Sequence, residues 1–190
     1  STERDRSRGG GLSLPGWDLH ALQACRPTGQ ACRGLRRCVR QALAYTEQRH
    51  ATQGGFGYTG TSPAGTGHHS LTGVGVLSFQ IWDQQANRAA RKGIRYIAAN
   101  TPFEYNTENS DLYAHYYSSQ AILRHGGKEW DAYNASFAKQ LLAAQQPDGS
   151  IKRPGGAGKP TAVGAHYANN NAEGILYRNC LCALMLEVYY

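Results

Sequence analysis

One pair of side chains in the sequence has the spacing of an acid–base pair. Asp111 and His115 are four residues apart, so a helix would place a carboxyl and an imidazole one turn apart on the same face. Such a pair could transfer a proton or supply two ligands of a zinc ion. No further ligand follows at the spacing of a zinc module. We therefore expect no complete catalytic set, no metal and no other cofactor, and Asp111 and His115 are the nearest catalytic candidates.

Aromatic and polar side chains gather around the same segment. The group comprises Tyr113, Tyr116, Tyr117 and Gln120, to which we add His68, His69 and His166. If the starts of enclosed helices face a central cavity, this group would line a pocket for an apolar or aromatic ligand with a cationic centre. The alternative is that the tyrosines are core residues whose hydroxyls reach a partner at the rim. Adjacent histidines project about 100° apart on a helix, which disfavours a shared ion at His68 and His69.

The five cysteines match no metal-binding pattern. Cys25 and Cys32 flank a short connection with a proline and a glycine, so a disulfide between two helix ends is reasonable in an oxidising compartment. The alternative is that all the cysteines are small buried apolar residues. The chain starts at Ser1 rather than at a methionine, which suggests that an upstream segment was removed. These features predict an extracytoplasmic protein, secreted or in the cell envelope.

The formal net charge of +7 raises the possibility of an anionic partner. The basic residues lie on two expected helix faces opposite apolar stripes: Arg33, Arg36, Arg37 and Arg40, then Arg88, Arg91, Lys92 and Arg95. Outer helix surfaces are normally charged, so we interpret both faces as solvated and do not expect nucleic acid as a partner. No run of about 18 apolar residues occurs, so no membrane span is expected either.

Helical segments of two kinds alternate along the chain. Those at 34–49, 86–99 and 130–145 carry one apolar stripe, whereas those at 17–25, 69–83, 111–124 and 173–189 are apolar in most directions. A helix that is apolar on all sides is enclosed by others. The alternation predicts an all-α fold of paired helices in one domain, residues 17–190. Residues 1–16 are rich in charge and glycine, which predicts a flexible N-terminal arm.

A short pattern recurs at the ends of the outward segments. An aromatic or apolar residue is followed four positions later by a polar amide at Tyr96 and Asn100, at Leu141 and Gln145, and more weakly at Ala44 and Gln48. The spacing of about 45 to 52 residues is typical of helical-pair repeats. The first and third copies run into glycine turns, Gly54-Gly55 and Gly149.

These residues carry a resemblance to a known superfamily. Gln145 followed by Pro-Asp-Gly149-Ser-Ile151 resembles the Gln-Trp motif of squalene-hopene cyclases, with Ile151 in place of the tryptophan. Lys92-Gly93, Tyr96 and Asn100 resemble the front half of that motif. Further segments are similar to toroid domains of bacterial cyclase-like proteins: Asp111 to Ala121, Gly126 to Trp130, and Leu184 to Tyr190. The resemblance implies structural roles for Gln145 and Gly149, beside the suggested Cys25–Cys32 link.

The resemblance implies the α/α toroid of squalene-hopene cyclases and protein prenyltransferases, but this chain departs from it. It offers about seven helices, which predicts an incomplete, open ring. It also lacks the Asp-x-Asp-Asp acid of the cyclases and the Asp, Cys and His zinc set of the transferases. We therefore expect a non-enzymatic binding or self-assembly module that self-associates through its open ends and its arm. The alternative is a terpenoid-cyclase-like or prenyl-binding enzyme with an apolar cavity.

Overall fold

The computed structural model describes residues 33–57, 71–107, 110–155 and 168–189. Within these ranges the chain forms six α-helices, a short 3-10 helix and no β-strand, which confirms the all-α prediction there. The elements are α2 (Arg33–Gln48), α3 (Thr72–Ile81), α4 (Arg88–Asn100), α5 (Leu112–His125), α6 (Gly127–Ala143), α8 (Ala172–Leu186) and η2 (Glu187–Tyr189). The expected arm 1–16 and the expected helix 17–25 lie outside the described residues.

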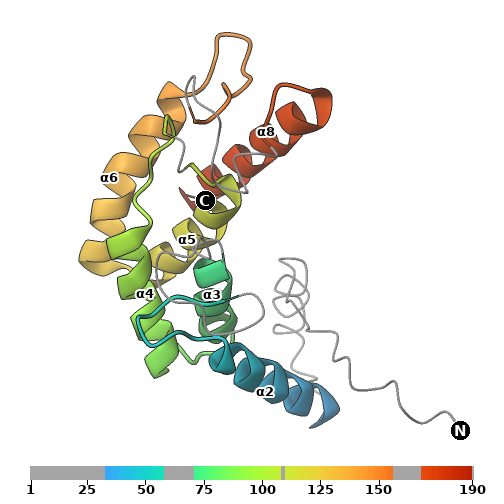
Figure 1. The fold of residues 1–190 in the computed structure, drawn as a ribbon, viewed down its shortest axis with the longest axis vertical. Helices are drawn as coiled ribbons and strands as arrows, with labels where there is room; N and C mark the ends of the chain where they lie inside the picture. The colour runs from blue at the N-terminus through green and yellow to red at the C-terminus, as the bar shows by residue number, and fades with distance from the viewer. Residues whose placement is uncertain (1–32, 58–70, 108–109, 156–167, 190) are drawn as a thin grey trace, which may run out of the picture.

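Helix α3 is buried on every side. It carries no charged residue, and all ten of its residues are buried. It packs against α2, α4 and α5 (Figure 1). Two glycines allow this crowding, because a Cβ on Gly73 would lie 2.6 Å from the Ser118 backbone nitrogen and one on Gly75 would lie 2.5 Å from the Phe56 ring. The enclosed helix predicted over 69–83 is confirmed.

Helices α2, α4 and α6 each bury a single face, as the amphipathic pattern predicts. Helix α4 buries residues such as Ile94 and Ile97 and exposes Arg88, Arg91 and Arg95. The same division holds for α6, which buries Tyr133, Phe137 and Leu141, and for α2, which buries Val39 and Leu43 and exposes Arg37 and Arg40. Asn87 caps the N-terminus of helix α4, because its Oδ1 accepts a hydrogen bond from the Ala89 backbone nitrogen at 2.7 Å. These helices cover the apolar ones with one face and present the other to solvent.

Helix α5 lies at the centre and contacts α3, α4, α6, α8 and η2. Nine of its fourteen residues are buried. The Gln80 side chain donates from Nε2 to the Ala121 carbonyl at 2.9 Å, which ties α3 to α5. The helix ends at Gly126, whose φ of +72° lies in the left-handed region that favours glycine. The helix predicted over 111–124 is confirmed, and it is enclosed along most of its length.

The connections that follow α2 and α6 have the same form. Each closes on one antiparallel bridge between residues six apart, His50 with Phe56 and Gln145 with Ile151. Each also contains a glycine with positive φ, +118° at Gly54 and +84° at Gly149. The predicted similarity of these two glycine turns is therefore present in the backbone.

A glutamine that the sequence pattern did not single out fastens the α4–α5 connection. Gln140 on α6 donates from Nε2 to the Phe103 carbonyl at 2.6 Å and accepts from the Tyr105 backbone nitrogen at 2.9 Å. Gln145, to which the resemblance assigns a structural role, contributes its backbone to the bridge, and its side chain is exposed. The side-chain hydrogen bonds that α6 makes to this connection thus come from Gln140 and from Ser136, whose Oγ also donates to the Phe103 carbonyl at 3.1 Å.

Helix α8 is the main departure from the expected fold. The sequence predicts an enclosed helix over 173–189, but only Gly174, Arg178, Cys182 and Met185 of α8 are buried. Leu176 is 65% exposed, and Ile175 and Leu184 are each 36% exposed. The prediction of an enclosed helix is wrong here because, among the described α-helices, only α5 packs extensively against α8. Within the described ranges it packs chiefly against α5 and η2 on one side.

Candidate functional site

The predicted aromatic cluster on α5 comes together in part. The Tyr117 ring meets the Tyr113 ring at a centroid distance of 4.9 Å and the Tyr116 ring at 4.8 Å, both edge to face. Burial, together with the neighbouring Tyr113 and Tyr116, raises the pKa of Tyr117 above its usual value. The Tyr117 hydroxyl therefore stays protonated and neutral at physiological pH. The three tyrosines form one packed group, as a core position or a pocket wall would require.

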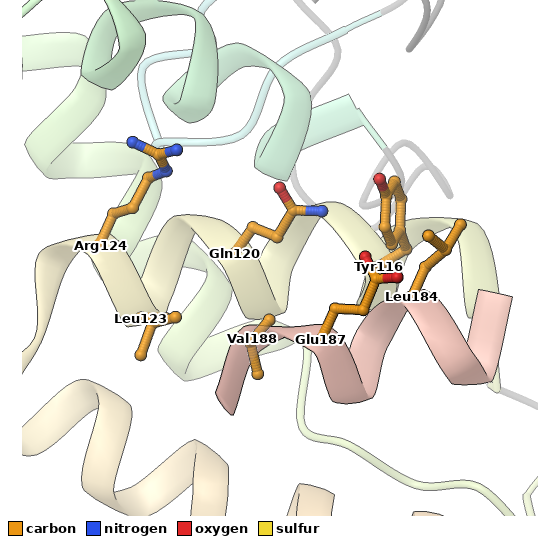
Figure 2. Close-up of a pocket in the computed structure, with 7 residues that line it drawn as sticks. All are labelled: Tyr116, Gln120, Leu123, Arg124, Leu184, Glu187 and Val188. Atoms are coloured by element: carbon orange, nitrogen blue, oxygen red, sulfur yellow. The ribbon is translucent and has the colours of Figure 1, made fainter. Parts of the chain in front are cut away.

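A pocket of about 290 Å³ lies between α5 and the end of the chain formed by α8 and η2 (Figure 2). Its lining residues are Tyr116, Gln120, Leu123, Arg124, Leu184, Glu187 and Val188. Two predicted binding residues, Tyr116 and Gln120, are among them, whereas Tyr113 and Tyr117 are not. We expected a cavity at the start of the enclosed helices. This pocket follows α5 from its middle toward its C-terminal end instead.

The pocket walls carry opposite charges that do not neutralise each other. Arg124 and Glu187 are both exposed, and neither has a hydrogen bond or an ion pair with any described residue. The Gln120 amide likewise has no hydrogen-bond partner among the described residues. Since α5 places Tyr116, Gln120 and Arg124 at four-residue spacing, the three side chains share one face of that helix. Figure 2 shows them in a row, with Glu187 toward the Tyr116 end and Arg124 at the other.

His115 points away from this pocket into an aromatic cluster. It is 2% exposed, its Nδ1 lies 3.0 Å from the Tyr133 hydroxyl, and its ring meets Phe103 at a centroid distance of 4.6 Å. Burial lowers the pKa of His115 to about 3 and raises the pKa of Tyr133. Both side chains are neutral at physiological pH. His115 and Tyr133 therefore form a hydrogen bond within the core.

Asp111 lies just before α5 rather than in it. Its backbone is extended, with φ −111° and ψ 97°, and its Oδ1 accepts a hydrogen bond from the Ala114 backbone nitrogen at 3.1 Å. That is the geometry of a helix N-cap. The prediction that Asp111 and His115 share a helix face assumed that both residues were helical. Because Asp111 is the cap, the structure gives the two candidates separate roles.

A buried arginine that we did not single out from the sequence holds α8 to two loops. Arg178 is 5% exposed, and it donates from Nε to the Ile151 carbonyl at 2.6 Å and from Nη1 to the Asn169 carbonyl at 2.5 Å. Beside it, burial raises the pKa of the Cys182 thiol to about 12, so this cysteine is an inert thiol at physiological pH. The sequence could have indicated this role, because Arg178 is the one basic residue in the largely apolar segment 173–189.

The other candidate residues fall into two groups. His68, His69, His166, Cys25 and Cys32 lie outside the described residues. The described cysteines are free thiols, exposed at Cys38 and Cys180 and buried at Cys182. In the part of the chain that the structure covers, no three His, Cys, Asp or Glu side chains are placed to hold a metal ion. None of the helices described is long and apolar enough to cross a bilayer.

Comparison with protein-family models, with curated proteins and with solved structures found no match to this chain.

Proposed function

We propose that this chain is a non-enzymatic self-association module in which the outer face of α8 packs against the same face of a second copy. The outer face is defined as Glu173, Leu176, Cys180, Ala183, Leu184 and Glu187, all of them exposed. Two leucines stand on either side of the small residues Cys180 and Ala183, which would let another helix approach closely. Burying this apolar surface on a partner would release the water it now orders.

The spacing of the outer face favours a second copy as the partner. Leu176 and Leu184 are each four residues from Cys180, and Glu173 and Glu187 are each seven residues from it. Two antiparallel copies related by a two-fold axis near Cys180 would therefore set each leucine against the other leucine of its partner. The same symmetry would set Glu173 of each copy opposite Glu187 of the other at the two ends of the contact. These like charges oppose association, and water and salt at the rim weaken their repulsion.

The kinship with α/α toroids is part of the same proposal. It is supported by the alternation of the enclosed α3 and α5 with the one-sided α2, α4 and α6, and by the matching turns after α2 and α6. An incomplete ring has an open end, and the open end of a helical solenoid needs a cap. Pairing through α8 would supply that cap.

The test is the mass of the full-length chain in solution, measured by sedimentation over a range of concentrations. We expect dimers at micromolar concentration and at least tenfold weaker association for Leu176→Gln, because each copy loses a buried leucine worth about 1.5 to 3 kcal/mol. The matched control is Leu142→Gln, since Leu142 is 59% exposed but lies on α6. A wild-type chain that is monomeric at about 100 µM, or equal weakening by both variants, would refute the proposal.

The position of the two-fold axis can be tested separately. If the axis passes near Cys180, a short bismaleimide should link two copies of the wild-type chain and of Cys38→Ser, but not of Cys180→Ser. Both cysteines are exposed, so reagent access does not favour either one. A dimer whose linkage depends on Cys38 instead would place the contact on α2.

A further inference from the structure

We infer that the pocket between α5 and the α8–η2 end binds a small zwitterion whose ammonium and carboxylate groups are separated by an apolar body. The site overlaps the outer face proposed for self-association at Leu184 and Glu187, so we infer it for the chain whose α8 is unpaired. Three features of the pocket favour such a ligand: its size, the charges that line it and the apolar side chains beside them.

The size of the pocket limits the ligand. A volume of about 290 Å³ is at the low end of ligand-binding cavities. A water molecule occupies about 30 Å³ of liquid, so the pocket has room for roughly ten atoms of that size. A ligand with on the order of ten non-hydrogen atoms has the size of an amino acid or a very small peptide. A long polyprenyl chain is too large for a pocket of this volume to enclose.

The charged side chains that line the pocket favour a ligand that carries both a positive and a negative charge. Arg124 presents a guanidinium and Glu187 a carboxylate, and neither is paired with a described residue. An anion would satisfy only Arg124, and a cation would satisfy only Glu187. Because the two side chains lie at opposite ends of the row in Figure 2, one ligand can satisfy both only if its own charges are separated. A ligand of this kind has an amino group at one end and a carboxyl group at the other.

The side chains beside the two charged groups fit the rest of such a ligand. Leu123, Leu184 and Val188 supply apolar surface for a short hydrocarbon segment. The Tyr116 ring beside Glu187 would add a cation–π contact to the ligand ammonium, and Arg124 can hold a carboxylate through two parallel hydrogen bonds. The Gln120 amide lies midway along the row and could bond a peptide group.

The experiment uses 6-aminohexanoate as the probe, with hexanoate and hexylamine as ligands that each lack one charge. Binding is measured by calorimetry with the full-length Leu176→Gln chain, whose association the proposed function expects to be weakened and whose substitution does not line the pocket. The result therefore does not depend on the proposed dimer. We expect 6-aminohexanoate to bind at least about fivefold more tightly than either single-charge ligand, the gain from one partly exposed ion pair. Equal binding of the three ligands, or no binding of 6-aminohexanoate up to about 10 mM, would overturn the inference.

Two variants test which side chain binds which charged group of the ligand. Arg124→Gln should bind 6-aminohexanoate no better than hexylamine, and Glu187→Gln should bind it no better than hexanoate. Lys128→Gln is the matched control, because Lys128 is exposed on the neighbouring α6 and does not line the pocket. All three substituted side chains lie on the surface, so the variants should unfold at wild-type temperatures. If Lys128→Gln weakens binding as much as the other two, the effect is one of overall charge and the pocket is not the site.

Discussion

Helices α3 and α8 are both rich in apolar residues, but their surroundings differ: α3 is enclosed and α8 is largely exposed. Both are apolar in most directions, and on that ground both were expected to be enclosed. All ten residues of α3 are buried, whereas four of the fifteen residues of α8 are. An apolar helix therefore shows that its surface needs cover, but its own sequence does not say whether the cover comes from the same chain.

The two helices also differ in how they are held. Helix α3 is in contact with three other helices, and its Gly73 lets the backbone of α5 approach closely. Helix α8 is held along one stripe, where Arg178 reaches the carbonyl groups of two loops. The stripe contains a buried cation bonded to neutral oxygens, while leucines of the same helix face outward. That distribution suits a helix whose apolar face belongs to an interface between chains.

The largest effect is expected where α3 is most crowded. In Gly73→Ala the new methyl group would meet the α5 backbone at 2.6 Å. Alanine favours a helix over glycine by about 1 kcal/mol, but two backbones that must move apart disturb the whole core. We expect a net loss of about 3 kcal/mol or more in the free energy of unfolding. Denaturant unfolding of the purified variant measures it.

A matched substitution on α8 sharpens this test. Ala183→Ser also adds a single atom to a small helical residue, but Ala183 is exposed on the outer face. Its effect on the free energy of unfolding should stay within about 0.5 kcal/mol. If Gly73→Ala cost no more than Ala183→Ser, the close contact between α3 and α5 would be disproved.

The inner stripe of α8 should be nearly as sensitive as α3. Met185 is fully buried, so Met185→Ala removes a core side chain and leaves a cavity. The expected loss is about 2 to 5 kcal/mol in the free energy of unfolding. Thermal or chemical unfolding at low protein concentration gives the value. A loss below about 1 kcal/mol would mean that α8 is not docked on its neighbours as described.

Acid should weaken α5, which lies between the two helices. The pKa of buried His115 is lowered to about 3, against about 6.5 in an unfolded chain. Between these values the unfolded chain binds the proton and the folded chain does not, so stability falls as pH falls below about 6.5. From pH 7 to pH 4.5 this group alone should cost about 2 to 3 kcal/mol.

The double variant His115→Leu, Tyr133→Phe isolates that contribution, since it removes the imidazole without leaving the Tyr133 hydroxyl unpaired. Its loss of stability between pH 7 and pH 4.5 should be smaller than that of the wild type by about 2 to 3 kcal/mol. If the double variant loses as much stability in acid as the wild type does, other groups cause the acid sensitivity.

Much of the fold could be predicted because helix periodicity is local. The stripes of α2, α4 and α6 and the wholly apolar character of α3 are visible in windows of ten to sixteen residues. The helix ends were less certain, because a cap and the first helical residue look alike in sequence. Asp111 is the example, since placing it inside the helix created a pairing with His115 that the structure does not make.

The candidate site was predicted less well, because it depends on which elements meet. Tyr116 and Gln120 were identified from their chemistry, but Arg124, Glu187 and Val188 became pocket residues only because η2 lies beside α5. Gln140 and Arg178 were missed for the same reason. Both side chains donate to backbone carbonyl groups of distant loops, and the pattern of side chains along the sequence does not reveal which carbonyl groups lie nearby.

The smallest expected effect is the sharpest test of the comparison between α3 and α8. Leu176 is 65% exposed, so in a dilute, monomeric sample Leu176→Gln should change the free energy of unfolding by less than about 0.5 kcal/mol. The same variant should weaken association, so the two measurements separate folding from pairing. A loss above about 1.5 kcal/mol, the value of a buried leucine, would show that the chain itself covers this face. Helix α8 would then be enclosed as α3 is, and the argument for a second copy would fail.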